Sequence, residues 1–463
     1  MASSRKRPRS DLAERVREQL LRHVPAGARV TLALSGGIDS IVALDILAPL
    51  ARSYPFALSC VHVNHGISPN ARVWAKFAAA AARRRGVRCA VRTVDRRPYR
   101  PLGPEGAARA ARYAVFAGLR SDFVVLAQHQ DDQAETVLLQ LIRGAGLPGL
   151  AAMPAIRPQT GRRAPRLLRP LLGVPREAIE RYAHERRCAW IEDETNADER
   201  LARNLLRRRV MPLLRRLNAE APGNLARSAG HLAEANELTG ALAAIDAADS
   251  TRNGRLSVDA LRRLPRARAK NVLRWMIAAG GQAAPTSAQL EELLRQLLAG
   301  RDDAAVAVSL DAVEVRRYRG EIWLVAAQSR PPQGFRARWN RRRNWPLPEL
   351  GGVLRFRAGR GEGISAAALA EGPLEARLRK GGERFQPDRK RPRRALKDLL
   401  QEAGVPPWER ERLPLLFAGE RLVLVPGIGV AAGFHAEPGE RGFVVAWDRL
   451  VVERPTRPKA MLK

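Results

Sequence analysis

The sequence has only three cysteines among its 463 residues, Cys60, Cys89 and Cys188. They are far apart and show no CxxC or Cys/His spacing, so we expect neither a disulfide framework nor an iron–sulfur or zinc site. Reduced thiols that pack as small apolar residues are the expectation. No apolar run is long enough to span a bilayer, and no apolar segment follows the basic residues 1–10 as it would in a secretory signal. These absences favour a cytoplasmic protein that does not enter a membrane.

Lysine and acidic residues are also scarce. Only eight of the 81 basic residues are lysines, and the 47 acidic residues leave a formal net charge of +34. Because arginine binds phosphate through two N–H groups and stacks on bases, a nucleic acid is the first partner to consider. A genome biased towards arginine codons could explain the choice of arginine over lysine, but it does not explain the net excess.

Strand-like and helix-like patterns alternate along the first part of the chain. β-Branched or apolar runs are separated by helical patterns at a spacing of roughly thirty residues, which predicts an α/β fold with a doubly wound parallel sheet. Ligands of such sheets bind outside the carboxyl ends of the strands. The predicted strands are residues 30–34, 56–63, 87–94 and 123–127, and the predicted helices that follow include residues 70–85, 105–119 and 131–143.

Composition predicts further domains downstream. Residues 218–330 are mostly amphipathic helix with strand-like runs near the end, and residues 331–350 have the Pro- and Arg-rich composition of a linker. Short strands frame one helix after that. We therefore predict an α/β domain at 1–217, a mainly helical domain at 218–330, a linker at 331–350 and a small α+β domain at 351–463.

The segment Ser35-Gly36-Gly37-Ile38-Asp39-Ser40 lies between the first strand and a helix. Two glycines allow a sharp turn and leave the backbone N–H groups open to an anion at the positive end of the helix dipole. Asp39 would repel phosphates unless a divalent cation lies between them, which indicates magnesium. A plain glycine turn capped by serine explains the same residues, so the loop alone does not decide.

Acidic residues open the helix after the fourth strand. Asp132 and Glu135 are three residues apart and share one helix face, where they could hold an ammonium group or a metal ion. The alternative is the ordinary enrichment of acids at a helix N-terminus together with a capping pattern.

Arg112 shares a helix face with Glu105 and Arg109. The arginines could neutralise phosphate, and an ordinary surface salt bridge is the alternative. His62 and His65 flank the end of the second strand, where a nucleotide base could lie, although such histidines are more often structural.

Basic residues are concentrated in two runs, seven within residues 200–216 and ten within residues 377–397. A solvated face explains a single run. Two dense runs in separate regions, with the net charge of +34, favour a polyanion larger than ATP.

Taken in order, these motifs resemble those of the tRNA(Ile)-lysidine synthases, a family of N-type ATP pyrophosphatases. The resemblance covers nearly the whole chain. It rests on the SGGxDS loop at 35–40, on His62-Val63-Asn64-His65-Gly66, on residues 105–113, on Asp131-Asp132-Gln133-Ala134-Glu135-Thr136, on residues 143–150, on Trp190-Ile191-Glu192-Asp193 with Arg203-Asn204, and on Gly382-Glu383-Arg384-Phe385 with Pro406-Pro407-Trp408.

The resemblance implies a ligase that uses ATP and magnesium. Such an enzyme adenylates the wobble cytidine of an isoleucine tRNA with a CAU anticodon, and the side-chain amine of L-lysine then displaces AMP to give lysidine. The modified tRNA reads AUA instead of AUG and is charged with isoleucine instead of methionine. The oligomeric state is open, and a homodimer is one expectation.

The resemblance also implies roles by position. Asp39 would bind magnesium, and Asp132 and Glu135 would bind the lysine ammonium. Arg112 would lie near the reacting phosphate and completes a catalytic set with these three acids. The ATP-binding residues would be Ser35, Gly36, Gly37, Ile38, Asp39, Ser40 and His62, and the tRNA-binding residues would be Arg203, Arg207, Arg208, Arg384, Arg389, Lys390 and Arg391.

One position departs from the pattern. Gln128 precedes His129 where many members of the family carry a second histidine. An amide can hydrogen-bond but cannot carry a proton, so an acid or base role at this position is in doubt.

Two other functions are considered. A related tRNA thiolase would have a similar loop, but thiolases need paired cysteines, which this chain does not supply. A nucleic-acid-binding protein with a merely structural loop has no need for unpaired acids at strand ends such as Asp39, Asp132 and Glu135.

Overall fold

The computed structural model describes residues 11–66, 68–158, 164–252, 255–282, 284–299, 306–310, 313–327, 329–369, 372–387 and 392–449. The chain divides into two compact units, residues 1–239 and residues 240–463. The division falls within the long helix α10 (Ala221–Asp249). Each unit is therefore considered by itself.

The first unit is built on a six-stranded sheet with the order β3-β2-β1-β4-β6-β5. Neighbouring strands are parallel, except that β5 runs antiparallel to β6 at the edge. The chain moves outward from β1 to β3 and then returns to β4 on the other side of β1, so strand order reverses between β1 and β4. The strands are β1 (Arg29–Ala33), β2 (Ala57–Asn64), β3 (Arg88–Thr93), β4 (Phe123–Val125), β5 (Ile156–Arg157) and β6 (Arg166–Leu168).

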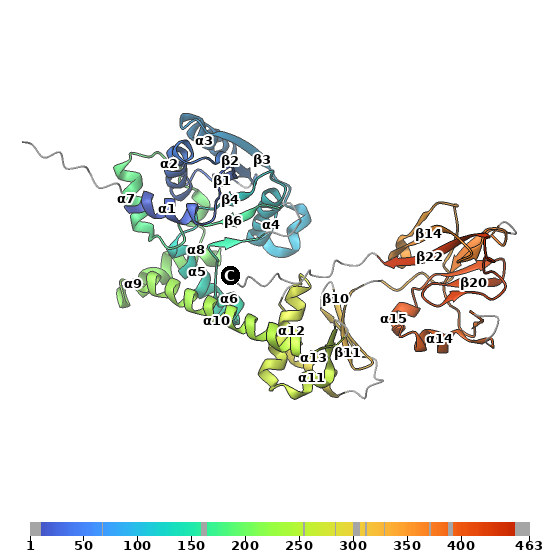
Figure 1. Ribbon diagram of the computed structural model, residues 1–463. Coiled ribbons are helices and arrows are strands. Elements are labelled where there is room, and N and C mark those ends of the chain that lie inside the picture. The colour runs from blue at the N-terminus through green and yellow to red at the C-terminus, as the bar shows by residue number, and fades with distance from the viewer. Residues whose placement is uncertain are drawn as a thin grey trace, which may run out of the picture. The chain divides into compact units, whose positions relative to one another are not determined.

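Helices cover both faces of this sheet (Figure 1). One face packs on an apolar cluster that includes Leu20, Leu44 and Ile179, and the other on a cluster that includes Phe116 and Leu167. The predicted doubly wound parallel sheet is thus confirmed. The α-helices of this unit up to residue 217 are α1 (Asp11–Leu21), α2 (Ile38–Ser53), α3 (Ala71–Arg84), α4 (Gly103–Ala117), α5 (Gln130–Ile142), α6 (Leu147–Leu150), α7 (Arg176–Glu185), α8 (Ala202–Leu205) and α9 (Met211–Leu217), and the 3-10 helices are η1 (Arg97–Leu102) and η2 (Glu194–Ala197).

The basic run at 200–216 forms a helical segment with an irregular turn. Residues 202–217 are helical throughout, but the π-helix η3 (Leu206–Val210) separates α8 from α9. The helix begins only at Ala202, because Asp198 accepts hydrogen bonds from the backbone N–H and the side chain of Arg200, which stabilises a turn there instead. Isolated π-turns within helices are frequent at functional sites.

The second unit begins with three helices packed on a five-stranded antiparallel sheet of order β7-β8-β11-β10-β9. Leu261, Leu273, Leu293 and Val315 lie in the core between them. These elements are β7 (Thr251–Arg252), β8 (Arg255–Ser257), α11 (Val258–Arg263), α12 (Arg266–Ala279), α13 (Ser287–Ala299), β9 (Ala307–Leu310), β10 (Val313–Tyr318) and β11 (Glu321–Ala326).

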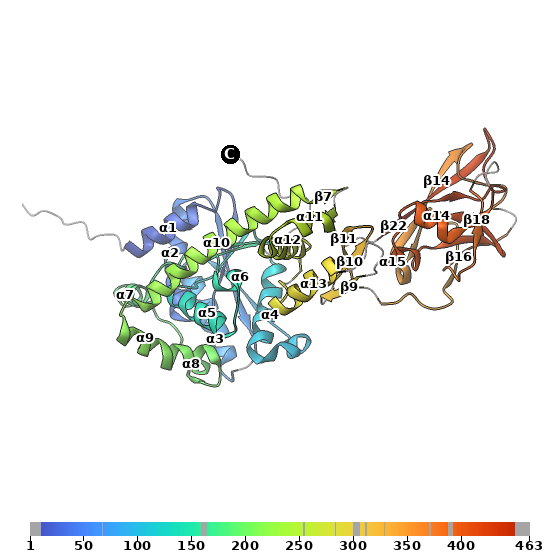
Figure 2. The ribbon, with the colours of Figure 1, turned by 90° about the horizontal axis from the view of Figure 1, so that it is seen from below.

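The rest of the second unit is mainly antiparallel strand, in sheets of order β12-β16-β19-β20-β21 and β13-β14-β22-β15 and a small pair β17-β18 (Figure 2). The predicted α+β character is confirmed. The elements are β12 (Arg336–Arg338), β13 (Asn344–Leu347), η4 (Pro348–Leu350), β14 (Gly352–Arg360), β15 (Ile364–Ser365), β16 (Leu374–Arg377), β17 (Arg384–Phe385), β18 (Arg394–Ala395), α14 (Leu396–Glu402), α15 (Pro407–Arg410), β19 (Leu415–Ala418), β20 (Arg421–Val425), β21 (Gly429–Val430) and β22 (Arg441–Arg449).

Part of the segment expected to be a linker is ordered strand. β12 pairs with β16, and β13 pairs with β14. Trp345 and Leu347 alternate with exposed neighbours and are buried in the core, a period-two pattern that the Pro- and Arg-rich composition conceals. The domain boundaries predicted after residues 217, 330 and 350 stay predictions.

Two findings concern the residues that the structure describes. None of their helices combines the length and the apolar character needed to cross a bilayer. The three cysteines are unpaired, as expected, and Cys60 and Cys188 are buried. Burial raises the pKa of the Cys60 thiol to about 12, so it stays protonated at neutral pH.

Candidate active site

The loop between β1 and α2 is held in shape by its own serines. The Ser40 hydroxyl accepts a hydrogen bond from the N–H of Gly36 at 3.0 Å and donates to the carbonyl of Gly37 at 2.9 Å. The exposed Ser35 donates to Ser40 at 3.1 Å and accepts from the N–H of Gly37. The first-turn N–H groups of α2 have no intrahelical partners, as at any helix start, and no side chain caps them.

Gly36 is required by the backbone. Its φ of +98° lies in the left-handed region, and a Cβ there would come within 3.0 Å of Ile191 Cδ1. The carbonyl of Gly36 also accepts a hydrogen bond from the backbone N–H of Ile191 at 3.0 Å. The segment around residue 191 therefore packs directly on the loop, and the loop is closed from that side.

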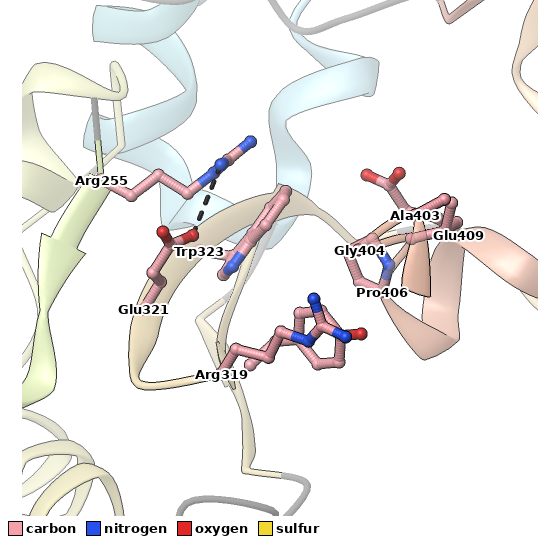
Figure 3. Close-up of a pocket in the computed structure, with 10 residues that line it drawn as sticks. Arg255, Arg319, Glu321, Trp323, Ala403, Gly404, Pro406 and Glu409 are labelled. Carbon is pink, nitrogen blue, oxygen red and sulfur yellow. Dashed lines mark hydrogen bonds and ion pairs between the residues drawn. The ribbon is translucent and has the colours of Figure 1, made fainter. Parts of the chain in front are cut away.

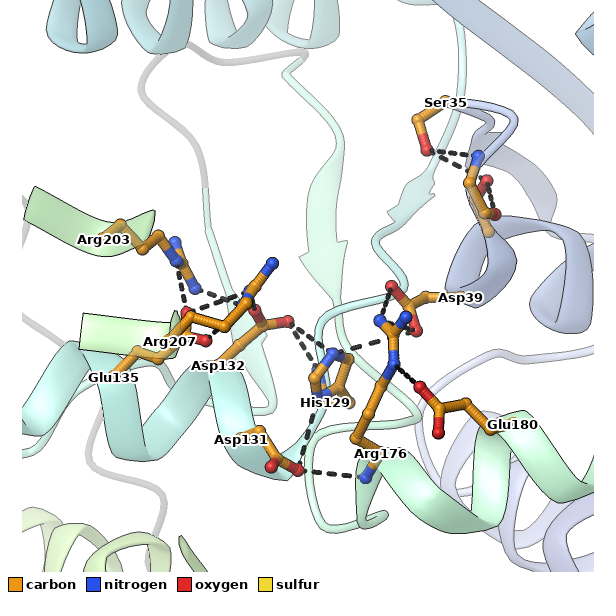
Figure 4. A network of polar contacts seen from close by, with 12 residues as sticks. Ser35, Asp39, His129, Asp131, Asp132, Glu135, Arg176, Glu180, Arg203 and Arg207 are labelled. Carbon is orange, nitrogen blue, oxygen red and sulfur yellow. Dashed lines mark hydrogen bonds and ion pairs between the residues drawn. The ribbon is translucent and has the colours of Figure 1, made fainter. Parts of the chain in front are cut away.

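Acidic side chains from α2 and α5 converge on His129, which is 2% exposed (Figure 4). Nε2 of His129 lies 3.8 Å from Oδ1 of Asp39 and 3.6 Å from Oδ2 of Asp132, while Nδ1 lies 3.8 Å from Oδ2 of Asp131. Nδ1 has no hydrogen-bond partner although it is buried. The imidazole thus lies at the centre of three carboxylates at the carboxyl ends of the strands.

Asp39 is paired with Arg176, the first residue of α7. Nη1 of Arg176 donates to both carboxylate oxygens of Asp39 at 3.0 Å, its Nε donates to Glu180, and its backbone N–H donates to Asp131. Burial raises the pKa of Asp39 above its ordinary value, although His129 and Arg176 oppose the shift. An arginine at a helix N-terminus is unfavourable to the helix dipole, and this is the signal by which Arg176 could have been found in the sequence.

Asp132 and Glu135 are paired with arginines of the 202–217 helix. Arg203 donates to Glu135 at 2.7 Å and to Asp132 at 2.9 Å, and Arg207 donates to the same two residues at 2.6 and 3.2 Å. Burial acts to raise the pKa of Asp132, but His129, Arg203 and Arg207 outweigh it and hold that pKa below its ordinary value. The negative charges of both acids are therefore balanced by arginines of the same chain.

His62 is predicted to bind the base and Arg112 the phosphate. His62 lies on β2, and Arg112 lies on α4 and contacts the residue after the end of β2. His62 is buried, and its Nδ1 is 2.9 Å from the carbonyl oxygen of Leu34. Arg112 is exposed on α4 and donates to Nε2 of His65 at 3.4 Å, whereas no described contact joins it to Glu105. Burial and the charges of Arg112 and Arg96 lower the pKa of His65 to about 4, which keeps this ring neutral at physiological pH.

The remaining predicted tRNA-binding residues lie elsewhere. Arg208 is exposed and donates to the carbonyl of Ala197, and Arg384 is exposed on β17 and donates to the carbonyl of Arg393. The other three, Arg389, Lys390 and Arg391, lie outside the described residues.

Gln128 has a structural partner. Its side-chain oxygen accepts a hydrogen bond from Nε of Arg169, which is 2% exposed and also donates to the carbonyl of Pro154 at 2.8 Å. A buried guanidinium needs such acceptors. The amide at this position therefore holds the Arg169 guanidinium.

A small cavity of about 230 Å³ opens beside His129. Acids and arginines both line it, which is the charge pattern that complements a zwitterion. Arg215 lines the cavity and also pairs with Asp131. The full lining is His129, Asp131, Glu135, Arg176, Glu180, Arg207, Met211 and Arg215. The sequence analysis assigned no role to Asp131, Arg176, Glu180 or Arg215, although Asp131 is part of the motif at 131–136.

The donor set fits magnesium only as an ion shared with phosphates. Among the residues described, no cluster of three or more His, Cys, Asp or Glu side chains could hold a metal ion by itself. Mg²⁺ commonly binds one or two carboxylates together with substrate phosphates and water. Asp39, at the start of α2 and beside the loop, meets that requirement.

The fold and this site define a class of ATP-binding domain. Residues 10–214 match the family model described as the PP-loop domain. Residues 256–323 match the TilS substrate binding domain, and residues 374–447 match the TilS substrate C-terminal domain.

Comparison with individual proteins narrows the class to one family. The chain is 41% identical to the tRNA(Ile)-lysidine synthase of Nitrosomonas europaea over 96% of this chain and 98% of that protein. It is 42% identical to the tRNA(Ile)-lysidine synthase of Ralstonia nicotianae over 90% of this chain and 92% of that protein. The chain belongs to the tRNA(Ile)-lysidine synthase family, and the resemblance noted in the sequence is confirmed.

Proposed function

We propose that this chain ligates L-lysine to the wobble cytidine of a CAU-anticodon isoleucine tRNA at the expense of ATP, giving lysidine, AMP and pyrophosphate. The observation that carries the proposal is the convergence of Asp39 and Asp132 on His129 beside the SGGxDS loop, with Glu135 joined to Asp132 through Arg203 and Arg207, in a chain that matches lysidine synthases along nearly its whole length. The enzyme acts in the cytoplasm, converting a tRNA that reads AUG to one that reads AUA.

In the first step the carbonyl oxygen of the cytidine base attacks the α-phosphorus of ATP, and pyrophosphate leaves. The first-turn N–H groups of α2 and the hydroxyl of Ser35 bind phosphate oxygens, with Ile38 and Asp39 supplying the N–H groups nearest the loop. Asp39 would hold magnesium together with the phosphates, and the ion would supply positive charge against the negative charge that develops on the leaving group. Arg112 serves the same purpose from α4, where it contacts His65, and His62 lies by the adenine.

In the second step the ε-ammonium of lysine loses a proton to solvent, and the resulting amine attacks the carbon that carries the adenylated oxygen. The carbon–nitrogen bond forms as the carbon–oxygen bond breaks, AMP leaves, and the extra proton of the attacking nitrogen is released to solvent. Asp132 and Glu135 hold the lysine ammonium, and the cavity beside His129 accommodates the amino acid, with Asp131 and Glu180 facing its cationic groups and Arg176 and Arg215 facing its carboxylate. No side-chain nucleophile is needed, because the adenylated base is already a good electrophile. Positioning and charge neutralisation carry the reaction.

The arginines around the acids exchange partners during binding. In the free chain Arg203 and Arg207 satisfy Asp132 and Glu135. The tRNA backbone offers phosphates that bind the same guanidinium groups, and lysine then replaces them on the carboxylates. This exchange reconciles the two roles assigned by position, in which the acids bind lysine and the arginines bind tRNA.

The downstream regions bind the rest of the tRNA. Residues 1–217 form the catalytic domain, and residues 218–330 and 351–463 form tRNA-binding domains, with Arg208, Arg384, Arg389, Lys390 and Arg391 as contacts to the phosphate backbone. A homodimer stays a prediction. Measurement of the molecular mass in solution tests it.

Substitution of Asp39 tests the proposal at the ATP end of the site. Asp39→Asn keeps the shape of the side chain but removes the magnesium-binding charge. We expect it to abolish pyrophosphate release that depends on lysine and tRNA, while tRNA still binds. Full activity of this variant would contradict the metal role of Asp39.

A further inference from the structure

A second cavity, of about 440 Å³, lies in the second unit, far along the sequence from the acids of α5. Its size is within the range of roughly 300–1,000 Å³ that is usual for small-ligand sites. β8, the β10–β11 hairpin and the turn from α14 to α15 line it (Figure 3). The lining residues are Arg255, Tyr318, Arg319, Glu321, Trp323, Ala403, Gly404, Val405, Pro406 and Glu409.

The hairpin turn at the edge of the cavity holds an arginine in an unfavourable conformation. Arg319 has a φ of +50° and Gly320 a φ of +71°, as in a two-residue turn that normally carries Asn-Gly. The Arg319 guanidinium donates to the carbonyl of Gln401 at the end of α14. A non-glycine residue in the left-handed region is uncommon and persists where the surrounding structure holds it. Here that side chain is held at the cavity.

Aromatic rings and arginines stack around the same cavity. The guanidinium of Arg255 lies 3.5 Å from the ring centroid of Trp323 and donates to Glu321 at 3.4 Å. Trp408 packs edge-on against both Trp323 and Tyr318. Layers of indole and guanidinium are the surfaces on which unpaired bases stack.

Two buried donors of this cluster have no acceptor. Nε1 of Trp323 and Nε1 of Trp408 are buried and make no hydrogen bond. Buried N–H groups without partners are rare and call for an explanation. Trp323 lines the cavity, so a ligand there with carbonyl or ring-nitrogen acceptors would supply a partner for its N–H, whereas Trp408 packs against Trp323 without lining the cavity.

The acids of the cavity add acceptors of their own. Glu409 pairs with Arg449 at 2.6 Å, and Glu321 pairs with Arg255. Carboxylates accept from the exocyclic amino groups of bases, while Arg255 and Arg319 meet phosphate. Donors, acceptors, stacking surface and positive charge are therefore all present within one cavity.

We infer that this cavity binds one unpaired nucleotide, with its base against Trp323 and its phosphate at Arg319 and Arg255. The inference rests on the proposed function, because the single-stranded 3′ end of the bound tRNA is one source of such a nucleotide. A free mononucleotide has the same chemistry and is the other source. The cavity is separate from the ATP loop, so it adds a recognition site for an unpaired nucleotide outside the acids of α5.

The test uses the full chain and two matched variants. Arg319→Asn removes the guanidinium and keeps a residue that tolerates the left-handed turn. Arg263→Gln removes one charge from the exposed end of α11, outside the cavity. Binding is measured with whole tRNA, with the same tRNA lacking its unpaired 3′ nucleotides, and with AMP, and 4-thiouridine at the 3′ end maps the contact by photocrosslinking.

If the tRNA end occupies the cavity, Arg319→Asn weakens binding of whole tRNA roughly tenfold, while binding of the truncated tRNA is unchanged by the substitution and the crosslink falls on the peptide of Trp323 or Trp408. If a free nucleotide occupies it, AMP binding is lost in Arg319→Asn and tRNA binding does not respond to truncation. Equal effects of Arg319→Asn and Arg263→Gln, with no crosslink to either tryptophan and no loss of AMP binding, overturn the inference.

Lysidine formation by the wild-type chain is measured in parallel. If lysidine forms but no nucleotide binds in the cavity, only the inference is overturned. If the crosslink maps to the cavity but no lysidine forms, only the proposed function is overturned.

Discussion

Arg203 donates to Glu135 at 2.7 Å, and this bond joins the predicted tRNA-binding helix to the predicted lysine-binding acid. Glu135 is 1% exposed and is also bound by Arg207. A carboxylate so deeply buried is stable only with such partners. In this structure the Glu135 carboxylate and the guanidinium groups of Arg203 and Arg207 therefore satisfy one another.

Glu135→Gln leaves Arg203 and Arg207 without their buried partner. We expect the free energy of unfolding to fall by about 2 kcal/mol, less than for a fully buried pair because both arginines are partly exposed. Chemical denaturation measures this. Glu180→Gln is the matched control, because its half-exposed pair with Arg176 contributes less than about 0.5 kcal/mol. Equal losses of stability in the two variants would show that the buried Glu135 contributes no more to stability than the half-exposed Glu180.

The two loop glycines serve different purposes, and alanine separates them. Gly36→Ala forces a left-handed alanine against Ile191 and is expected to lower stability by about 1–2 kcal/mol and to abolish ATP binding. Gly37 has a φ of −70° and room for a Cβ, with the nearest atom 3.6 Å away. Gly37→Ala should therefore keep stability within about 0.5 kcal/mol while weakening ATP binding, because its Cβ stands where phosphate approaches. Normal ATP binding by both variants would exclude the loop as a phosphate site.

The opposite pKa shifts of Asp39 and Asp132 predict a pH dependence. The raised pKa of Asp39 means that its ionised form opposes folding; its contribution to stability is present below the unfolded value of about 3.9 and is lost as pH rises through the folded pKa. The contribution of Asp132 is present above that value and is lost as pH falls through its lowered folded pKa. On acidification Asp39 is therefore neutralised first.

We expect the affinity for ATP with magnesium to fall on acidification before the fold does. The Asp39→Asn variant lacks this carboxylate, so the pH dependence of its ATP affinity comes only from the titration of ATP itself. The difference between wild type and variant is then the contribution of Asp39. Calorimetric binding between about pH 5 and pH 8 measures it. Superimposable pH profiles of wild type and variant would contradict a role for Asp39 in binding the metal.

The basic run near residue 390 predicts a salt-dependent contact. Replacing Arg389, Lys390 and Arg391 with alanine should weaken tRNA binding and flatten its salt dependence by about two to three units of slope, with little effect on ATP affinity. Filter binding at several salt concentrations measures this. Arg22→Gln, an exposed charge on the first unit, is the control. An unchanged slope in the triple variant would make the run a solvated surface.

The sequence predicted the parts of the site that are local in the chain. The strand, loop and helix at residues 30–47 and the acids that open α5 follow from patterns a few residues long. The ion pairs were not predictable, because Arg176 is 137 residues from Asp39 and Arg203 is 68 residues from Glu135. Strands of two or three residues, such as β5 and β6, also carry too little alternation to be recognised. β12 and β13 were concealed by an arginine-rich composition.

The most direct measurement of the central claim is the transfer of labelled lysine to tRNA. The chain is incubated with labelled lysine, ATP, magnesium and unmodified CAU-anticodon isoleucine tRNA, and the label is located by nuclease digestion. The account predicts label at the wobble cytidine, dependent on ATP and absent with Asp39→Asn. A tRNA that binds and yet carries no label at that cytidine with the wild-type chain would contradict it.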